Sequence, residues 1–210
     1  LDPEVAHIET FRRDPARVWR LLIQGLRSIL AEARPNPAHM GLARLEAWGL
    51  LQGVITQNVD SLHQKGGSRA VVEFHGSFAR LRCTRCHRET AVAELVLDPA
   101  ALPPRCGCGG VLRPDCVFFG ELIPPAALEQ AQRMAAACDL MLVVGTSATV
   151  QPAAMVPVLA KESGARVIEI NPEPTPLTGR VSDVLIRGQA GAVIRDLVAA
   201  VERLRAGADR

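Results

Sequence analysis

Four cysteines in two close pairs constrain this chain more than any other feature. Two residues separate Cys83 from Cys86, and Cys106 and Cys108 follow nineteen residues later with one residue between them. Four thiolates on two short turns suit the tetrahedral coordination of zinc. The pattern therefore predicts a structural Zn²⁺ site, closed to water because the protein supplies all four ligands.

The segment that carries these cysteines, residues 81–113, differs in composition from the rest of the chain. It holds the paired cysteines together with Pro103, Pro104 and several glycines, and it has too few apolar residues for a core of its own, so it needs a metal to hold it together. Four reduced cysteines without a metal are the alternative. Disulfides are disfavoured because the chain opens without a secretory signal. We predict that residues 81–113 form a zinc-binding insert within a larger domain.

Length and charge exclude several classes of function. A chain of 210 residues with 48% hydrophobic residues suits one mid-sized domain. A net charge of +2, without clustered lysine and arginine, argues against direct binding to nucleic acid or membranes. The cysteine segment also lacks aromatic residues on which bases could stack. No stretch approaches the roughly 18 apolar residues of a membrane span, so we predict a cytoplasmic protein.

Strands and helices alternate outside the cysteine segment. Helices are predicted over residues 14–32, 37–48, 124–137, 152–163 and 191–205, and strands over residues 50–56, 71–74, 139–144, 166–170 and 183–186. The later strands are almost continuously apolar, which is typical of a parallel sheet with helices on both faces. The predicted fold class is α/β, with a Rossmann-like domain formed by residues 1–80 and 114–210 and a helical N-terminal part, residues 1–48.

Several short motifs occur in an order that is specific to one family. Residues 56–67 read TQNVDSLHQKGG, residues 74–76 read FHG, and residues 113–121 read RPDCVFFGE. Gly145-Thr146-Ser147 and Ile170-Asn171 follow at predicted strand ends. Together with the cysteines, these motifs resemble the sirtuin family of NAD-dependent protein lysine deacylases, in particular its small prokaryotic members.

The resemblance implies a chemistry. Sirtuins remove acyl groups from protein lysine and consume NAD, giving nicotinamide, acyl-ADP-ribose and free lysine. The resemblance makes His75 the general base and Asn58 a second catalytic residue. Histidine suits the role because its pKa is ordinarily near neutral. The alternative for His75 is a purely structural role.

The resemblance also implies binding residues, each of which has a structural alternative as a turn or core residue. The residues expected to bind NAD are Gln57, Asn58, Val59, Asp60, Gly145, Thr146, Ser147, Asn171, Pro172, Glu173 and Ala190. Those expected to bind the acyl-lysine peptide are Val117, Phe119, Gly120 and Glu121. Backbone groups near Gly120 could pair with the peptide as an added strand.

The sequence departs from the family pattern in two places. Sirtuins usually begin with a strand leading to a G-A-G-[IV]-S stretch, which this sequence does not contain. Either the sequence omits residues, or the chain is a truncated and inactive form. Succinyl-preferring members carry a Tyr-x-x-Arg pair where this chain has Leu22 and Gly25. A carboxylate on the acyl group would lack its charged partner there, so acetyl or apolar acyl groups are expected.

Two other functions stay open at this point. One is mono-ADP-ribosyl transfer to protein, which some sirtuin-like proteins perform. The other is a non-catalytic, zinc-stabilised module that binds peptide or nucleotide.

Overall fold

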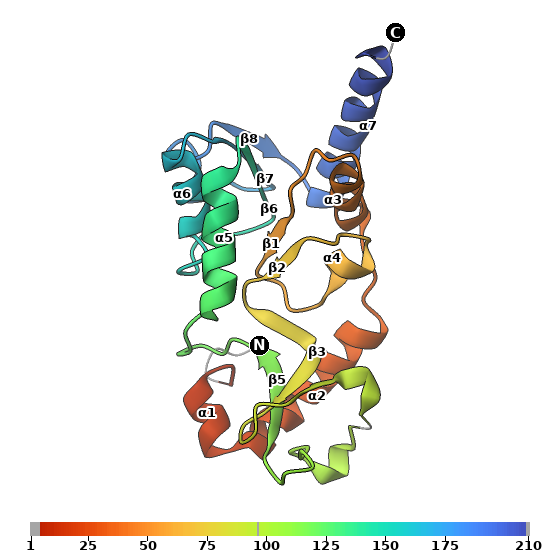
Figure 1. Cartoon of the computed structure of the whole chain (residues 1–210), viewed down its shortest axis with the longest axis vertical. Helices are drawn as coiled ribbons and strands as arrows, with labels where there is room; N and C mark the ends of the chain where they lie inside the picture. Colours follow the sequence, from red (N-terminus) through yellow and green to blue (C-terminus); the bar gives the residue numbers. More distant parts are fainter. Residues whose placement is uncertain (1–4, 96, 209–210) are drawn as a thin grey trace. The chain divides into compact units, whose positions relative to one another are not determined.

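The computed structural model describes residues 5–95 and 97–208, and these residues form two compact units (Figure 1). Unit 1 comprises the chain up to Arg34 together with Thr56–Ser61 and His75–Pro124. Unit 2 comprises Pro35–Ile55, Leu62–Phe74 and the chain from Pro125 onward. The domain boundaries predicted from the sequence stay a prediction.

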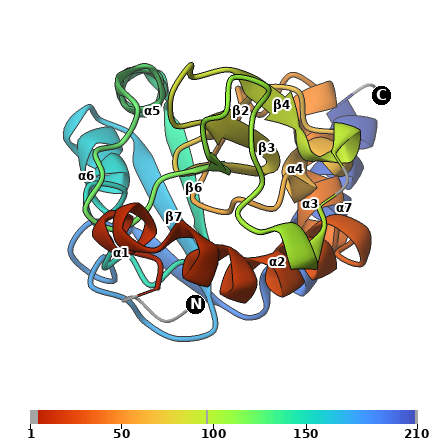
Figure 2. The same cartoon turned by 90° about the horizontal axis from the view of Figure 1, so that it is seen from below.

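Unit 1 packs two helices against a small antiparallel sheet. The helices are α1 (Ile8–Arg13) and α2 (Pro15–Ala31), which follow one another in Figure 2. The sheet has the order β4-β3-β5, with β3 at Gly76–Cys83, β4 at Glu89–Ala91 and β5 at Leu112–Cys116. Two short 3-10 turns, Val92–Glu94 and Pro99–Ala101, lie between β4 and β5.

Helix α2 begins where the sequence predicts. The Asp14 side chain accepts a hydrogen bond from the Arg17 amide at 2.9 Å, and Pro15 occupies the first turn. The helix buries Trp19, whose indole N–H donates to the Leu112 carbonyl at 2.8 Å. This bond joins α2 to the first residue of β5, so the helix and the sheet share one core.

Unit 2 contains a parallel sheet with helices on both faces. Strands β6 (Leu140–Val144), β7 (Arg166–Asn171) and β8 (Val184–Arg187) pair in that order and run parallel. Its long helices are α3 (Pro37–Ala47), α5 (Pro125–Ala137), α6 (Met155–Glu162) and α7 (Ala190–Ala208). The shorter elements are β1 (Val54–Thr56, whose last residue belongs to unit 1), α4 (Leu62–Lys65) and β2 (Val71–Glu73).

Alternate residues of β7 face different cores. Ile168 and Ile170 pack with side chains of α3 and α7, including Ile194. Val167 points to the other face and packs with Val143. This alternation explains the nearly continuous apolar strands, and it confirms the predicted α/β class.

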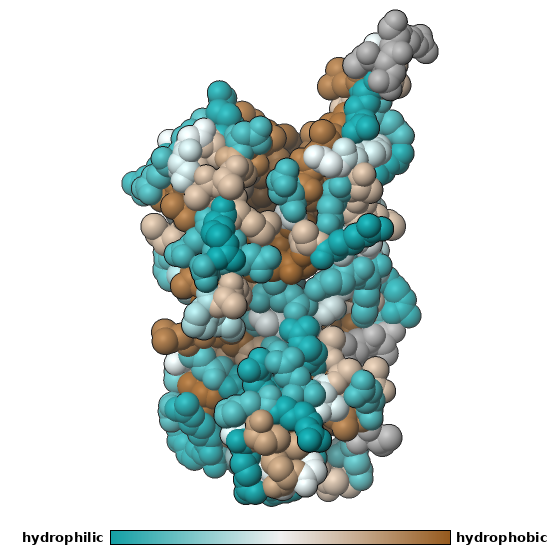
Figure 3. All heavy atoms as spheres, viewed as in Figure 1, coloured by the Kyte–Doolittle hydropathy of each residue, from teal (hydrophilic) through white to brown (hydrophobic). Residues whose placement is uncertain are grey.

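Among the described residues, β1 pairs with β2 in a separate two-stranded sheet, and β6 and β8 are the edge strands of the parallel sheet. Hydrophobic atoms gather in the upper part of Figure 3, whereas the lower part, over β3 and β5, is largely hydrophilic. Within residues 5–95 and 97–208, no helix has both the length and the apolar character needed to cross a membrane.

Some predicted elements differ from the observed ones. The strand predicted over residues 50–56 is too long, because only β1, Val54–Thr56, forms a strand there. Leu50, at the predicted start, is 55% exposed. The helix predicted from residue 152 begins at Met155. Helix α1 and the three strands of unit 1 were not predicted, because that region has no regular apolar repeat.

Candidate functional site

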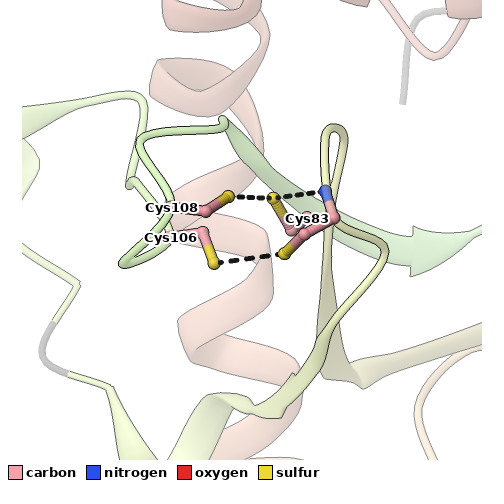
Figure 4. A group of neighbouring side chains, drawn as sticks. Cys83, Cys106 and Cys108 are labelled. Carbon is pink, nitrogen blue, oxygen red and sulfur yellow. Dashed lines mark hydrogen bonds between the residues drawn. The ribbon is translucent and has the colours of Figure 1, made fainter.

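Four cysteine side chains of unit 1 converge on one point. Cys83 ends β3, and Cys106 and Cys108 lie in the loop before β5, with their sulfur atoms turned toward one another (Figure 4). The Sγ atoms of Cys83 and Cys108 are 3.5 Å apart, and those of Cys86 and Cys106 are 3.7 Å apart. All four atoms lie within 4.8 Å of one another. Tetrahedral zinc with four thiolates requires sulfur–sulfur distances of about 3.8 Å, so the four residues fit the ion.

The backbone near Cys83 favours the thiolate form of this residue. The amides of Cys86 and Arg85 donate to Cys83 Sγ at 3.5 and 3.4 Å. The Cys86 amide, helped by the Arg85 amide and opposed by burial, lowers the pKa of Cys83 to about 6. At Gly110 a Cβ atom would lie 2.6 Å from Cys83 Sγ, so glycine is needed there for the close approach.

The predicted base, His75, immediately precedes β3 in unit 1. Its ring Nδ1 lies 3.3 Å from the Gln57 carbonyl, and its own carbonyl accepts a hydrogen bond from the Val117 amide at 2.9 Å. Burial lowers the pKa of His75, and the Gln57 carbonyl partly opposes the shift. When Nδ1 carries the proton shared with Gln57, the neutral ring keeps its lone pair on Nε2.

The loop at residues 57–60 is tied to the strand that follows His75. The Val59 carbonyl accepts from the Phe78 amide at 2.8 Å. The hydroxyls of Ser61 and Ser77 are 2.8 Å apart, and Ser77 is fully buried. The amide of Asn58, whose side chain is exposed, donates to the Thr56 hydroxyl at 3.1 Å. Gln57, Asn58, Val59 and Asp60 are therefore held in the same unit as His75.

The predicted peptide-binding residues form the loop after β5, also in unit 1. The Val117 amide donates the hydrogen bond to the His75 carbonyl already described, and Phe119 is 54% exposed. Gly120 has φ of +84°, a conformation that favours glycine. The Glu121 carboxylate lies within the loop itself, against Arg113. The structure thus brings Gln57, His75 and Val117 together.

The remaining predicted NAD-binding residues lie in unit 2, at the carboxyl edge of its parallel sheet. Gly145 follows β6, Asn171 ends β7, and Ala190 begins α7 after β8. The Gly145 amide donates to the Ile170 carbonyl at 3.0 Å, and the Gly188 amide donates to the Asn171 carbonyl at 3.2 Å. Ligands of open α/β sheets bind at this edge.

Gly145 adopts a backbone conformation that favours glycine. Its φ is +61°, and a Cβ atom placed on it would meet no heavy atom within 4 Å, so its backbone borders open space. The hydroxyls that follow take part in local contacts: Thr146 accepts from the Ala148 amide at 3.1 Å, and Ser147 lies 2.9 Å from the Thr149 hydroxyl. The sequence predicts a turn between a strand and a helix here, and the structure places these residues in the loop between β6 and α6.

The loop after β7 is anchored by a buried carboxylate that the sequence analysis missed. Glu169 is 1% exposed and accepts hydrogen bonds from the hydroxyls of Thr175, Thr178 and Ser182 at 2.6, 2.7 and 3.1 Å. Asn171 donates to the Glu173 carbonyl at 2.8 Å, and Pro172 and Glu173 are exposed. A charged residue inside an apolar strand was the available signal, since such a group requires partners when buried.

Leu22 and Gly25, the two positions from which the sequence predicts no preference for succinyl groups, lie on α2. Leu22 is 3% exposed and belongs to the core of unit 1, and a Cβ atom at Gly25 would meet no heavy atom within 4 Å. Neither residue can pair with a carboxylate.

Comparisons with known proteins agree with these motifs. The family model described as Sir2 family matches residues 2–152. The NAD-dependent protein deacylase 2 of Pyrobaculum aerophilum is 50% identical over 201 residues, which cover 95% of this chain and 79% of the relative. The NAD-dependent protein deacylase of Thermococcus kodakarensis is 48% identical over 210 residues, with coverages of 97% and 80%.

Solved structures are similar as well. A Sir2 homolog–NAD complex has a TM-score of 0.90 at 43% identity and covers 96% of this chain and 77% of that one. A Sir2 bound to acetylated peptide has a TM-score of 0.89 at 33% identity, with coverages of 94% and 83%. The family match, the identities and the shared motifs lead to one conclusion: the chain belongs to the Sir2 family.

Proposed function

We propose that this protein is an NAD-dependent protein lysine deacylase that removes acetyl or apolar acyl groups from protein or peptide lysine. The observation that carries the proposal is the position of His75. One half-buried histidine contacts the loop of residues 57–60 through its ring and the loop of residues 117–121 through its carbonyl. The similarity to the named deacylases supports the same function.

The chain's own residues account for the steps that a deacylase needs. NAD, when bound, supplies the ribose carbon that accepts the acyl oxygen as nicotinamide leaves. His75 would remove a proton from a ribose hydroxyl, and Asn58 and Asp60, with Gln57 and Val59, would hold the nicotinamide end. Gly145, Thr146 and Ser147 would bind the phosphate and ribose oxygens, and Asn171, Pro172, Glu173 and Ala190 would hold the adenosine end. Val117, Phe119 and Gly120 receive the acyl-lysine arm. The zinc held by the four cysteines is structural and takes no part in the reaction.

The test is a His75→Ala variant assayed for release of nicotinamide and of deacetylated peptide. Loss of the general base should reduce kcat about 10²- to 10⁴-fold. His87→Asn is the matched control, because His87 is exposed and has φ of +58°, which asparagine tolerates. Equal activity of His75→Ala and wild type would refute the assignment of the base.

The same assay separates the other functions. Labelled NAD that leaves ADP-ribose on protein would indicate transfer in place of deacylation. Binding of NAD and acetyl-peptide without nicotinamide release would indicate a non-catalytic module. A cytoplasmic location belongs to the proposal, and fractionation of cells of the source organism tests it.

A further inference from the structure

Arg113, in β5, and Glu121 form an ion pair across the loop of residues 117–120. Arg113 Nη1 donates to Glu121 Oε1 and Nη2 donates to Glu121 Oε2, both at 2.6 Å. The side chains are only 15% and 24% exposed, so water screens the pair weakly. A bidentate arginine–carboxylate pair fixes both the distance and the orientation of its two partners.

The same two side chains also hold the backbone inside the loop. Glu121 Oε2 accepts from the Phe118 amide at 2.9 Å, and the Glu121 amide donates to the Phe118 carbonyl at 3.0 Å. Arg113 Nη2 donates to the Cys116 carbonyl at 2.7 Å. The guanidinium carbon lies 4.6 Å from the centre of the Phe118 ring. Both carboxylate oxygens of Glu121 are therefore engaged by the protein, and Arg113 balances its charge.

Two further contacts fix the outer side of this loop. The Phe119 amide donates to the Ala6 carbonyl, and the Ile8 amide donates to the Phe119 carbonyl, both at 2.9 Å. At Gly120 a Cβ atom would lie 2.7 Å from the His7 ring, so a side chain is excluded there. Hydrogen bonds thus connect the loop to the segment before α1 and, through Val117, to His75. The pair of Arg113 and Glu121 holds the loop together.

We propose that Arg113 and Glu121 are positioning residues that lock the loop of residues 117–120 for the acyl-lysine peptide, and that Glu121 itself does not contact the peptide. The inference rests on the proposed function and replaces the expectation, drawn from the sequence, that Glu121 binds the peptide. Burial raises the pKa of Glu121, but the hydrogen bonds from Arg113 and Phe118 and the Arg113 charge outweigh it, so the pKa lies below its usual range. The carboxylate stays ionised and paired at neutral pH.

The kinetic test compares Glu121→Gln, Arg113→Lys and the double variant with wild type. Breaking a charge-assisted pair should raise KM for an acetyl-peptide about tenfold or more. KM for NAD and kcat should change less than about threefold, because the loop positions the peptide and contributes no reacting group. The double variant should resemble either single variant, because the residues act as one pair. Glu9→Gln, which breaks the exposed Arg12–Glu9 pair, is the control.

A panel of acetyl-peptides distinguishes positioning from direct contact. If Glu121 only positions the loop, Glu121→Gln should raise KM by the same factor for peptides with basic, neutral and acidic residues beside the acyl-lysine. A loss confined to the basic peptides would show that Glu121 binds substrate directly, and it would overturn the inference.

Hydrogen exchange gives a readout that does not depend on turnover. The Phe119 amide, which is bonded to the Ala6 carbonyl, should exchange faster in Glu121→Gln than in wild type, while amides of β3 keep their protection. Unchanged protection at Phe119 would overturn the inference. Wild-type protein without deacylase activity would instead refute the proposed function, and the exchange measurement would still decide whether the pair locks the loop.

Discussion

Gly76→Ala is the substitution for which the structure predicts the largest local effect. Gly76 has φ of +76°, and a Cβ atom placed there would lie 2.1 Å from the Asp115 carbonyl oxygen and 2.9 Å from the Cys116 Cα. Both contacts are with backbone, so no side chain can rotate away to make room. The strands β3 and β5 must separate by more than an ångström at this point.

The expected cost follows from these two defects. A left-handed conformation costs a non-glycine residue roughly 1–2 kcal/mol, and forcing an extra methyl group into a packed site costs about 1–3 kcal/mol. Together they should lower the free energy of unfolding of unit 1 by about 2–5 kcal/mol, a large share of the 5–15 kcal/mol typical of a domain. Gly76 pairs with Cys116, and these residues are the chain neighbours of His75 and Val117, which share a hydrogen bond. Separating the strands should therefore displace His75 and lower kcat as well.

Urea denaturation of the zinc-loaded protein measures the change in stability, and deacetylation of a peptide measures the change in rate. Gly25→Ala on α2 is the matched control, because its Cβ would meet open space and its helix should gain about 0.5–1 kcal/mol. A Gly76→Ala variant within 0.5 kcal/mol of wild type, in a measurement accurate enough to detect about 1 kcal/mol, would refute the reasoning.

Three further predictions concern pH, metal and substrate. Burial lowers the pKa of His75, so its ring stays neutral to a lower pH than an ordinary histidine. The acid limb of the pH profile of kcat/KM should therefore have an apparent pKa below 6.5, and an apparent pKa above that value would contradict the assignment of the base. Removing zinc with a chelator, or by Cys86→Ala, should abolish the protection of β4 and of the loop before β5 in hydrogen exchange, and metal analysis should find one zinc per wild-type chain. Acetyl-peptide should turn over at least about tenfold faster than succinyl-peptide, since Leu22 and Gly25 offer no charged partner; faster desuccinylation would count against it.

Local patterns predicted most of unit 2 because its elements are regular and well buried. The strands β6, β7 and β8 are apolar runs bounded by turn residues, and the predicted and observed ends differ by one residue at most. The strand predicted from Leu50 was too long because an apolar run reports burial tendency and not pairing.

The strands of unit 1 were harder to predict from the sequence because they pair residues that are far apart in the chain. Strands β3 and β5 pair across the whole cysteine segment, with Cys83 opposite Leu112. The metal ligands were predictable, since the spacing of the four cysteines is typical of a zinc site. The partners of Glu121 and Glu169 were not, because the sequence shows a carboxylate without showing which donors surround it.

The two tryptophans give this protein an internal optical label for each unit. Trp19 is fully buried in unit 1, and Trp48 in unit 2 has the guanidinium carbons of Arg44 and Arg205 at 4.9 and 5.2 Å from the centre of its ring. The chain contains no tyrosine, so no second fluorophore obscures them. Emission from Trp19 reports the water-free interior of one unit, and emission from Trp48 reports a cation-flanked ring of the other. Replacing either ring by phenylalanine leaves a spectrum that follows the melting of a single unit.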